Sequence, residues 1–297
     1  MAFSDLALKA ASESAVMAAH KNIAKLSLFA KNFSELNGQP GKSIAVPVYN
    51  LTDAAAFNAS NNNYATGTNE IGGELVTLDQ HLVKPVSITD VEEAETGIRW
   101  ASDTAGALAD TLTRGVNAYV FGLINSTNVT TTAETPTTKA GYAGLYAVAE
   151  QNDIPVDRCV VALAPTQFAS VLSMLDSNVY GGSEAIRLGV IEGLYGFKGF
   201  VCTSNLPEGT DGAIICDSAI GVASRYLAPG TEGAYPEVFT ATDEDGFTIG
   251  FRRFMDLATG SNKFAADVLF GAKIIQPSKI VRLVTTPASD ESGIVGG

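Results

Sequence analysis

The stretch that decides the fold is QHLVKPVSI (residues 80–88), which runs without a break into TDVEE (residues 89–93). The first part mixes apolar and polar residues in the way expected of a strand with one buried face. In the second part Thr89 can cap a helix while Glu92 reaches back to it, and the acidic residues lie at the positive end of the helix dipole. The chain is therefore predicted to pass directly from a strand into a helix.

The helix that begins at Thr89 is predicted to be unusually long. Apolar residues recur every three or four positions, at Ile98, Ala101, Ala105, Leu108, Leu112, Val116, Tyr119, Val120 and Leu123. This spacing predicts a helix to about Asn125, of roughly 36 residues and about 54 Å. Such a helix is much longer than the average helix of a globular protein, and it is typical of a strut.

A two-stranded ribbon is predicted before the helix. Residues 42–49 alternate apolar and polar side chains, and residues 75–88 do much the same. The tip between the strands, residues 52–73, has Phe57, Tyr64 and Ile71 as its only large apolar groups. A hairpin without a core is marginal in water. We therefore expect the ribbon to be stabilised by a neighbouring copy, with Phe57, Tyr64 and Ile71 at that interface.

The remaining segments predict an α+β fold. Residues 1–37 are predicted to form a helical arm that ends at Gly38–Gly41, and a Thr-rich link covers residues 126–138. An α/β region follows, with helices at 139–151, 165–175 and 218–226, strands at 158–163, 200–203 and 213–216, and a loop containing Tyr180, Gly181 and Gly182 that leads into a short helix. The last part is β-rich, with strands at 237–242, 247–254, 263–267, 272–275 and 280–285.

The composition excludes several function classes. A net charge of −13 without a basic cluster argues against a dedicated nucleic-acid binder, and no apolar run reaches the eighteen residues of a membrane span. Cys159, Cys202 and Cys216 lie far apart in apolar runs, which predicts buried, inert thiols. His20 and His81 lack the partners of a catalytic triad or a metal site. We expect no enzyme activity, no cofactor and no metal.

The order of arm, ribbon, long helix, α/β unit and β-rich return resembles the Hong Kong 97-type capsid fold of tailed bacteriophages. Residues 80–93 resemble the return of the E-loop, the extended hairpin of that fold, into its spine helix. Further resemblance lies in five short segments, namely residues 193–201, 204–207, 213–220, 246–252 and 267–272.

The resemblance implies a division of the chain into five parts. These are an N-terminal arm at 1–39, an E-loop at 40–88, a peripheral or P-domain with the spine helix at 89–138, an axial or A-domain at 139–240, and P-domain return strands with a tail at 241–297. In this family the axial domains gather at five-fold and six-fold axes. Tyr180, Gly181 and Gly182 are therefore the expected axial interface.

The resemblance also implies a function. The chain is expected to be a major capsid subunit that assembles into the pentamers and hexamers of an icosahedral shell. That shell would enclose phage double-stranded DNA without sequence-specific binding. Its expected partners are a portal, a separate scaffolding protein and a decoration protein, with assembly in the host cytoplasm and a final place in the virion capsid. An encapsulin, the shell protein of a bacterial compartment, is the alternative, and a small α/β enzyme built on residues 139–226 is a remote one.

Overall fold

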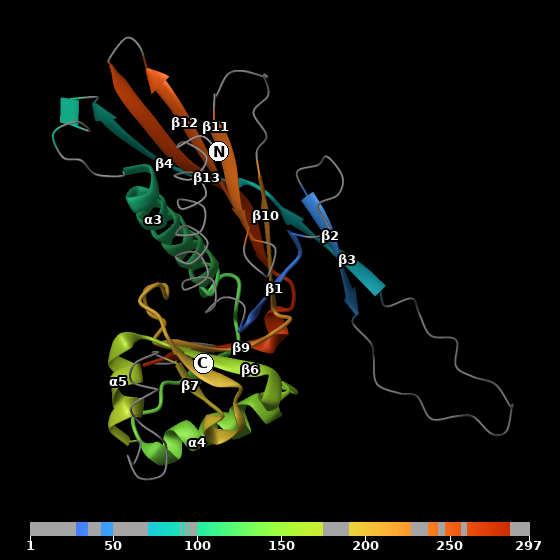
Figure 1. Ribbon diagram of the computed structural model, residues 1–297. Helices are drawn as coiled ribbons and strands as arrows, with labels where there is room; N and C mark the ends of the chain where they lie inside the picture. The colour runs from blue at the N-terminus through green and yellow to red at the C-terminus, as the bar shows by residue number, and fades with distance from the viewer. Residues whose placement is uncertain are drawn as a thin grey trace, which may run out of the picture.

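The computed structural model describes residues 28–34, 43–49, 71–89, 91–92, 95, 100–174, 190–226, 237–242, 247–256 and 260–285. Within these residues the fold is α+β, as predicted, with two six-stranded sheets and a two-stranded ribbon. In Figure 1 the first sheet forms the upper part of the molecule, the second sheet lies in the lower part with its helices, and the ribbon projects sideways from the first sheet.

The first sheet is organised around β13 (Ser261–Ile274), its longest strand. On one edge β13 pairs antiparallel with β4 (Gln80–Thr89). On the other edge it pairs first with β12 (Thr248–Asp256) and then with β10 (Ile220–Arg225). The outer strands are β11 (Glu237–Thr242), which pairs with β12, and β1 (Ala30–Asn32), which runs parallel to β10.

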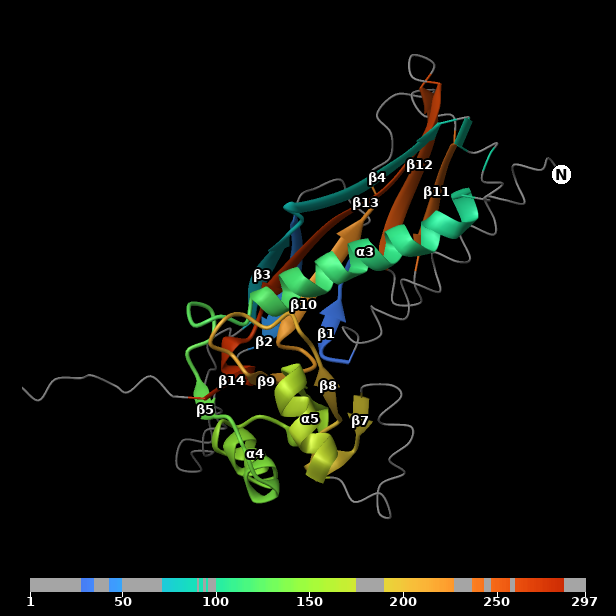
Figure 2. The same ribbon diagram turned by 90° about the vertical axis from the view of Figure 1, so that its left-hand side faces the viewer.

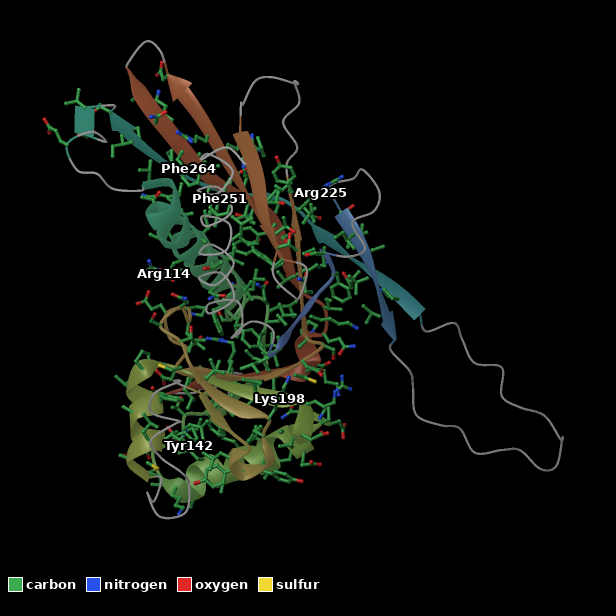
Figure 3. All side chains as sticks on the ribbon, in the orientation of Figure 1. Arg114, Tyr142, Lys198, Arg225, Phe251 and Phe264 are labelled. Atoms are coloured by element: carbon green, nitrogen blue, oxygen red, sulfur yellow. The ribbon has the colours of Figure 1, made fainter. Side chains whose placement is uncertain are left out.

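Helix α3 (Trp100–Gly122) lies along one face of this sheet, as Figure 2 shows. Five residues that the sequence spacing predicted are buried in α3, namely Ala105, Leu108, Leu112, Val116 and Val120. Ala109 and Phe121, which the spacing did not predict, are buried as well. Tyr119 meets Phe270 of β13 edge to face at 5.4 Å. Deeper in the sheet Phe251 stacks on Phe264 at 5.8 Å, and Figure 3 labels both rings. The helix therefore contributes the second layer of the core.

The predicted junction of strand and helix is confirmed. The backbone N–H of Thr89 donates to Glu92 Oε2 at 2.9 Å, and the N–H of Glu92 donates to Thr89 Oγ1 at 3.3 Å. This reciprocal pair is a capping box. Helix α3 starts at Trp100 and has 23 residues, and it ends three residues before the predicted end at Asn125. A single helix of roughly 36 residues from Thr89 stays a prediction, because residues 96–99 lie outside the described residues.

The second sheet has the order β5-β14-β9-β6-β8-β7. Its central strands β14 (Ile280–Val284), β9 (Gly212–Cys216) and β6 (Cys159–Leu163) are buried along their whole length. The outer strands are β5 (Thr132–Glu134), β8 (Gly199–Cys202) and β7 (Val190–Glu192). Helices α4 (Lys139–Gln151) and α5 (Pro165–Met174) belong to the same unit, and both agree with the sequence prediction to within one residue. Fully buried strands of this kind require cover on both faces.

The chain crosses between the two sheets through α3, which connects β4 to β5, and through two further crossings that lie side by side. One of these two is the turn from β9 to β10, and the other leads from β13 to β14 through the short helix Pro277–Lys279. The carbonyl of Ala219 in the first crossing accepts hydrogen bonds from the N–H groups of Ile275 and Gln276 in the second, at 2.8 and 3.2 Å. A further link comes from Lys198, whose Nζ donates to the carbonyl of Leu28 at 3.0 Å near the junction (Figure 3). One continuous hydrophobic core spans both sheets.

Four secondary-structure predictions are wrong. The strand predicted at 75–88 is two strands, because the ribbon strand β3 (Ile71–Thr77) ends before β4 begins at Gln80 beside β13. The predicted helix at 218–226 contains strand β10, because its residues pair with β1 and β13 and Gly221 packs closely against Ile275 and Phe33. The predicted arm helix is contradicted at residues 30–32, which form β1 and complete the sheet edge beside β10. The two strands predicted at 263–267 and 272–275 are one strand, since Gly271 continues the ladder. The helix predicted after Gly182 and the arm before residue 28 lie largely outside the described residues.

Sheet membership also departs from the sequence boundaries. β5 lies within the predicted P-domain segment 89–138, yet it pairs with β14 in the second sheet, and two later strands change sheets as well. β10 lies within the predicted axial segment 139–240, yet it pairs with β1 and β13 in the first sheet. β14 lies within the return segment 241–297, yet it pairs with β5 and β9 in the second sheet. β10 and β14 each follow directly from one of the two side-by-side crossings, so the chain changes sheets earlier than a linear division assumes.

Replacing Gly271 tests the contact at the base of the ribbon. A Cβ at this position would overlap the backbone carbonyl of Thr77, which cannot rotate away. We expect Gly271→Ala to lower the free energy of unfolding by about 1–3 kcal/mol, as overpacking does. The matched control is Gly115→Ala in α3, where the new Cβ would meet only the flexible end of Leu82 at 2.8 Å. There the gain in helix propensity offsets the crowding, with a net change below about 1 kcal/mol. Urea denaturation of both variants measures the difference, and equal losses would contradict this account.

Candidate assembly surfaces

The ribbon consists of β2 (Ser43–Tyr49) and β3 (Ile71–Thr77), which pair antiparallel over seven residues. Alternate side chains point to opposite faces of such a pair. One face is buried and carries Ile44, Val46, Val48 and Val76, with Leu78 following the strand. These residues form a second hydrophobic cluster with Ala223 and Ile275 of the main body, against which Phe33 and Leu269 also pack. The inner face of the ribbon is thus satisfied within the subunit.

Two further contacts fix the base of the ribbon on β13. The carbonyl of Thr77 crosses directly over Gly271, where a larger residue has no room. Nearby, Lys273 Nζ lies 2.6 Å from Glu74 Oε2. Both partners of this ion pair are about half exposed, so solvent screens most of its strength. Together these contacts set the direction in which the ribbon leaves the first sheet (Figure 1).

The outer ribbon face has no cover within the described residues. It consists of Ser43, Ala45, Pro47, Leu75 and Thr77, all of which are exposed. Leu75 is 54% exposed and lies opposite Ala45 in the strand register, beside the pair of Pro47 and Gly73. Most of these side chains are small, and none of the five is charged.

The residues predicted for the ribbon interface are only partly described. Ile71 is the first residue of β3, and it pairs with Tyr49 at the outer end of the described ribbon. Phe57 and Tyr64 lie outside the described residues, as do Tyr180, Gly181 and Gly182 of the predicted axial loop. Their roles remain predictions.

Leu75 is the interface candidate that sequence reasoning missed. The sequence contains a pattern that indicates this, because Leu75 and Val76 are adjacent apolar residues in a strand with two faces. In a strand of period two, neighbours cannot both face the same core. Val76 is fully buried, so Leu75 must be exposed.

The polar side chains that could carry catalysis have structural partners. Glu92 bonds to Thr89, and this backbone hydrogen bond holds the pKa of the Glu92 carboxyl below its usual range. His81 Nε2 lies 3.4 Å from Asp267 Oδ2, an oxygen that also accepts from Arg252 at 3.0 Å. In the described part of the chain no group of three or more His, Cys, Asp or Glu side chains is placed to hold a metal ion. No described helix is both long and apolar enough to cross a membrane.

Comparison with solved structures places this arrangement among capsid folds. The chain is 17% identical to the structure titled "Mycobacterium phage Che8", with a TM-score of 0.57, and the match covers 86% of this chain and 89% of that one. A capsid of a native GTA particle is 12% identical with a TM-score of 0.59, covering 90% of each chain. A virus-like particle from Pyrococcus furiosus is 13% identical with a TM-score of 0.53, covering 91% of this chain and 98% of that one. At these identities the likeness shows a shared fold. A comparison with curated proteins finds no match.

A family model described as "Phage capsid protein" matches residues 73–283, which is more than half of the chain. The match begins on β3 of the ribbon, continues through α3 and both sheets, and ends within β14. It therefore includes the strand-to-helix junction at Thr89 and the crossings between the sheets. Since the match takes in the body of the subunit and not one motif, the chain belongs to the phage capsid protein family.

Proposed function

We propose that this chain is the major subunit of a phage head, assembling into pentamers and hexamers that close an icosahedral shell around double-stranded DNA. The observation that carries the proposal is the ribbon. Its inner face is buried on its own subunit, its outer face is exposed and apolar, and it extends away from the body. A two-stranded element of this kind gains little stability in water unless another surface covers it.

The second part of the proposed interface lies at the symmetry axes. The axial domain corresponds to the second sheet with helices α4 and α5, and the loop with Tyr180, Gly181 and Gly182 meets the equivalent loops around five-fold and six-fold axes. Contacts between unlike surfaces of identical subunits form rings when the rotation closes. The same subunit then builds both kinds of ring.

The ribbon connects neighbouring subunits. Its outer face, together with Phe57, Tyr64 and Ile71, lies on a neighbour and removes Leu75 from water. A stable interface buries roughly 1,200–2,000 Å², far more than one ribbon face offers. Several weaker contacts for each subunit make assembly reversible at first and the closed shell durable.

The charge of the chain fits a container for DNA better than a DNA-binding protein. With a net charge of −13, the shell encloses the polymer without holding it by counter-ion release. The further partners that we propose are a portal, a separate scaffolding protein and a decoration protein. Assembly takes place in the host cytoplasm, and the product is the virion capsid. The match to a phage capsid family favours this proposal over the encapsulin alternative.

Deleting Ala55–Asn69 tests the role of the ribbon. We expect a folded, soluble subunit, because the deletion leaves β2, β3 and both hydrophobic clusters in place. We also expect it to form no regular shells. Negative-stain microscopy and light scattering of the wild type and the deletion variant give the answer. Normal shells from the deletion variant would rule out the proposed role.

A single substitution separates assembly from folding. Leu75→Asp places a charge on the outer ribbon face, where the side chain is 54% exposed, so the free energy of unfolding should change by less than about 1 kcal/mol. Shell yield should nevertheless fall at least tenfold, because the charge would be buried at the interface. The matched control is Val76→Asp, which buries a charge in the subunit itself and should prevent folding. A Leu75→Asp variant that assembles like the wild type would show that this face is not an interface.

A further inference from the structure

Cys159 and Cys216 lie directly opposite each other in the central pair of strands of the second sheet. They are Cα partners in the antiparallel ladder of β6 and β9, and they form its last pair. Both residues are buried, with exposed fractions of 0% and 3%. The sequence alone predicted isolated, inert thiols, and the strand register is what brings these two together.

The hydrogen-bond pattern defines what kind of pair they form. At the next position outward, the N–H of Asp217 donates to the carbonyl of Arg158 at 3.2 Å. Hydrogen-bonded and non-hydrogen-bonded pairs alternate along an antiparallel ladder, so Cys159 and Cys216 form a non-hydrogen-bonded pair. The carbonyl of Cys159 agrees with this, because it turns away from β9 and accepts from the N–H of Lys198 at 2.9 Å.

Such a pair has the spacing that a disulfide requires. Residues in a non-hydrogen-bonded pair have Cα atoms about 4.5 Å apart, with side chains on the same face. Disulfides join residues whose Cα atoms are about 4.4–6.8 Å apart. The Arg158 guanidinium donates three hydrogen bonds to Asp217, at 2.9, 3.0 and 3.2 Å, and holds the two strand ends together beside the cysteines.

The two sulfur atoms have different surroundings. The Cys159 thiol donates to the carbonyl of Pro155 at 3.0 Å. The Cys216 sulfur lies 3.7 Å from Asp217 Oδ1 and 4.0 Å from Ser218 Oγ, at the turn that ends β9. Hydrogen bonding between the two thiols lowers the pKa of Cys216 and raises that of Cys159.

We propose that Cys159 and Cys216 are a redox-active pair that closes into an intramolecular disulfide when the protein meets a peroxide. The Cys216 thiolate attacks one peroxide oxygen, forming a sulfenic acid and releasing hydroxide, which leaves as water with a proton from the medium. The Cys159 sulfur then attacks the Cys216 sulfur and loses its proton. The S–S bond forms, and the sulfenic oxygen leaves as the second water. Two thiols and one hydrogen peroxide thus give one disulfide and two waters.

Cys202 is not part of the pair. In the parallel ladder of β6 and β8 it lies opposite Leu163, at the other end of β6 from Cys159. Four residues of strand separate these levels by about 13 Å, which is well beyond the reach of a disulfide. Cys202 can therefore be replaced without removing either partner of the pair.

The disulfide would lock the centre of the second sheet. It would close the loop between residues 159 and 216, which contains α5, β7 and β8. A link across a loop of this length restricts the unfolded chain strongly. One consequence rests on the function proposed above. Shells assembled in a reducing cytoplasm would become more stable after release into an oxidising medium, where the disulfide forms.

The test uses the purified full-length protein with Cys202→Ser, because residues 199–225 form one tryptic peptide that contains both Cys202 and Cys216. Reduced protein is treated with hydrogen peroxide, quenched, alkylated and digested. We expect residues 159–187 and 199–225 to be recovered as one linked product, with the mass of the intact chain lower by two hydrogen atoms. The melting temperature should rise by roughly 5–10 °C and return on reduction.

The control is the double variant Cys159→Ser, Cys202→Ser, in which peroxide should give no such rise. If it does not fold, the wild-type protein still provides the mass change and the reversible melting shift. Two unlinked alkylated peptides, irreversible oxidation of each thiol, or a link between two chains would each overturn the proposal. None of these readouts needs shells, so the outcome is independent of the proposed capsid function.

Discussion

The fourteen-residue strand β13 is the element to which the other parts of the subunit are attached. β4 occupies one edge, β12 and β10 share the other, and α3 packs on one face through Tyr119 and Phe270. Gly271 lets the end of the ribbon cross directly over this strand, and Lys273 pairs with Glu74 of β3. After its last residue the chain passes into the second sheet. A displacement of β13 would therefore move the ribbon, the long helix and the crossings together, which gives the subunit a body stiff enough to hold a projecting element.

The proposed assembly into shells relies on the ribbon, which has one buried and one exposed face. An isolated two-stranded hairpin is marginal in water, and one buried face is not enough to remove the apolar character of the other. The inner face rests on Ala223 and Ile275, whereas Leu75 on the outer face remains 54% exposed. The hydrophobic core of the subunit is therefore buried, while one apolar side chain of the ribbon stays exposed to water. Under the proposed function, a neighbouring copy covers this exposed face.

Much of the fold could be predicted where one periodicity dominates. The spacing in α3, the capping box at Thr89 and the bounds of α4 and α5 all follow from local rules, and all are confirmed. The secondary-structure predictions failed where contacts with residues far away in the sequence determine the structure. Residues 220–225 are a strand because β1, β13 and Ile275 surround them, and nothing in that short apolar run separates strand from helix. The pairing of Cys159 with Cys216 likewise depends on a strand register that spacing cannot reveal. Leu75 was predictable from alternation, while Phe57, Tyr64 and the loop at Tyr180–Gly182 remain predictions.

Electron microscopy of the purified wild-type protein, with particle size measured by light scattering, tests the central claim most directly. We expect closed shells of regular size, many times larger than a single 30.9 kDa chain. Rings of five or six subunits would be the expected intermediates at low concentration. A 30.9 kDa monomer that persists at every concentration would contradict the proposal that this chain assembles into shells. A monomer that turns over a substrate would contradict it most strongly.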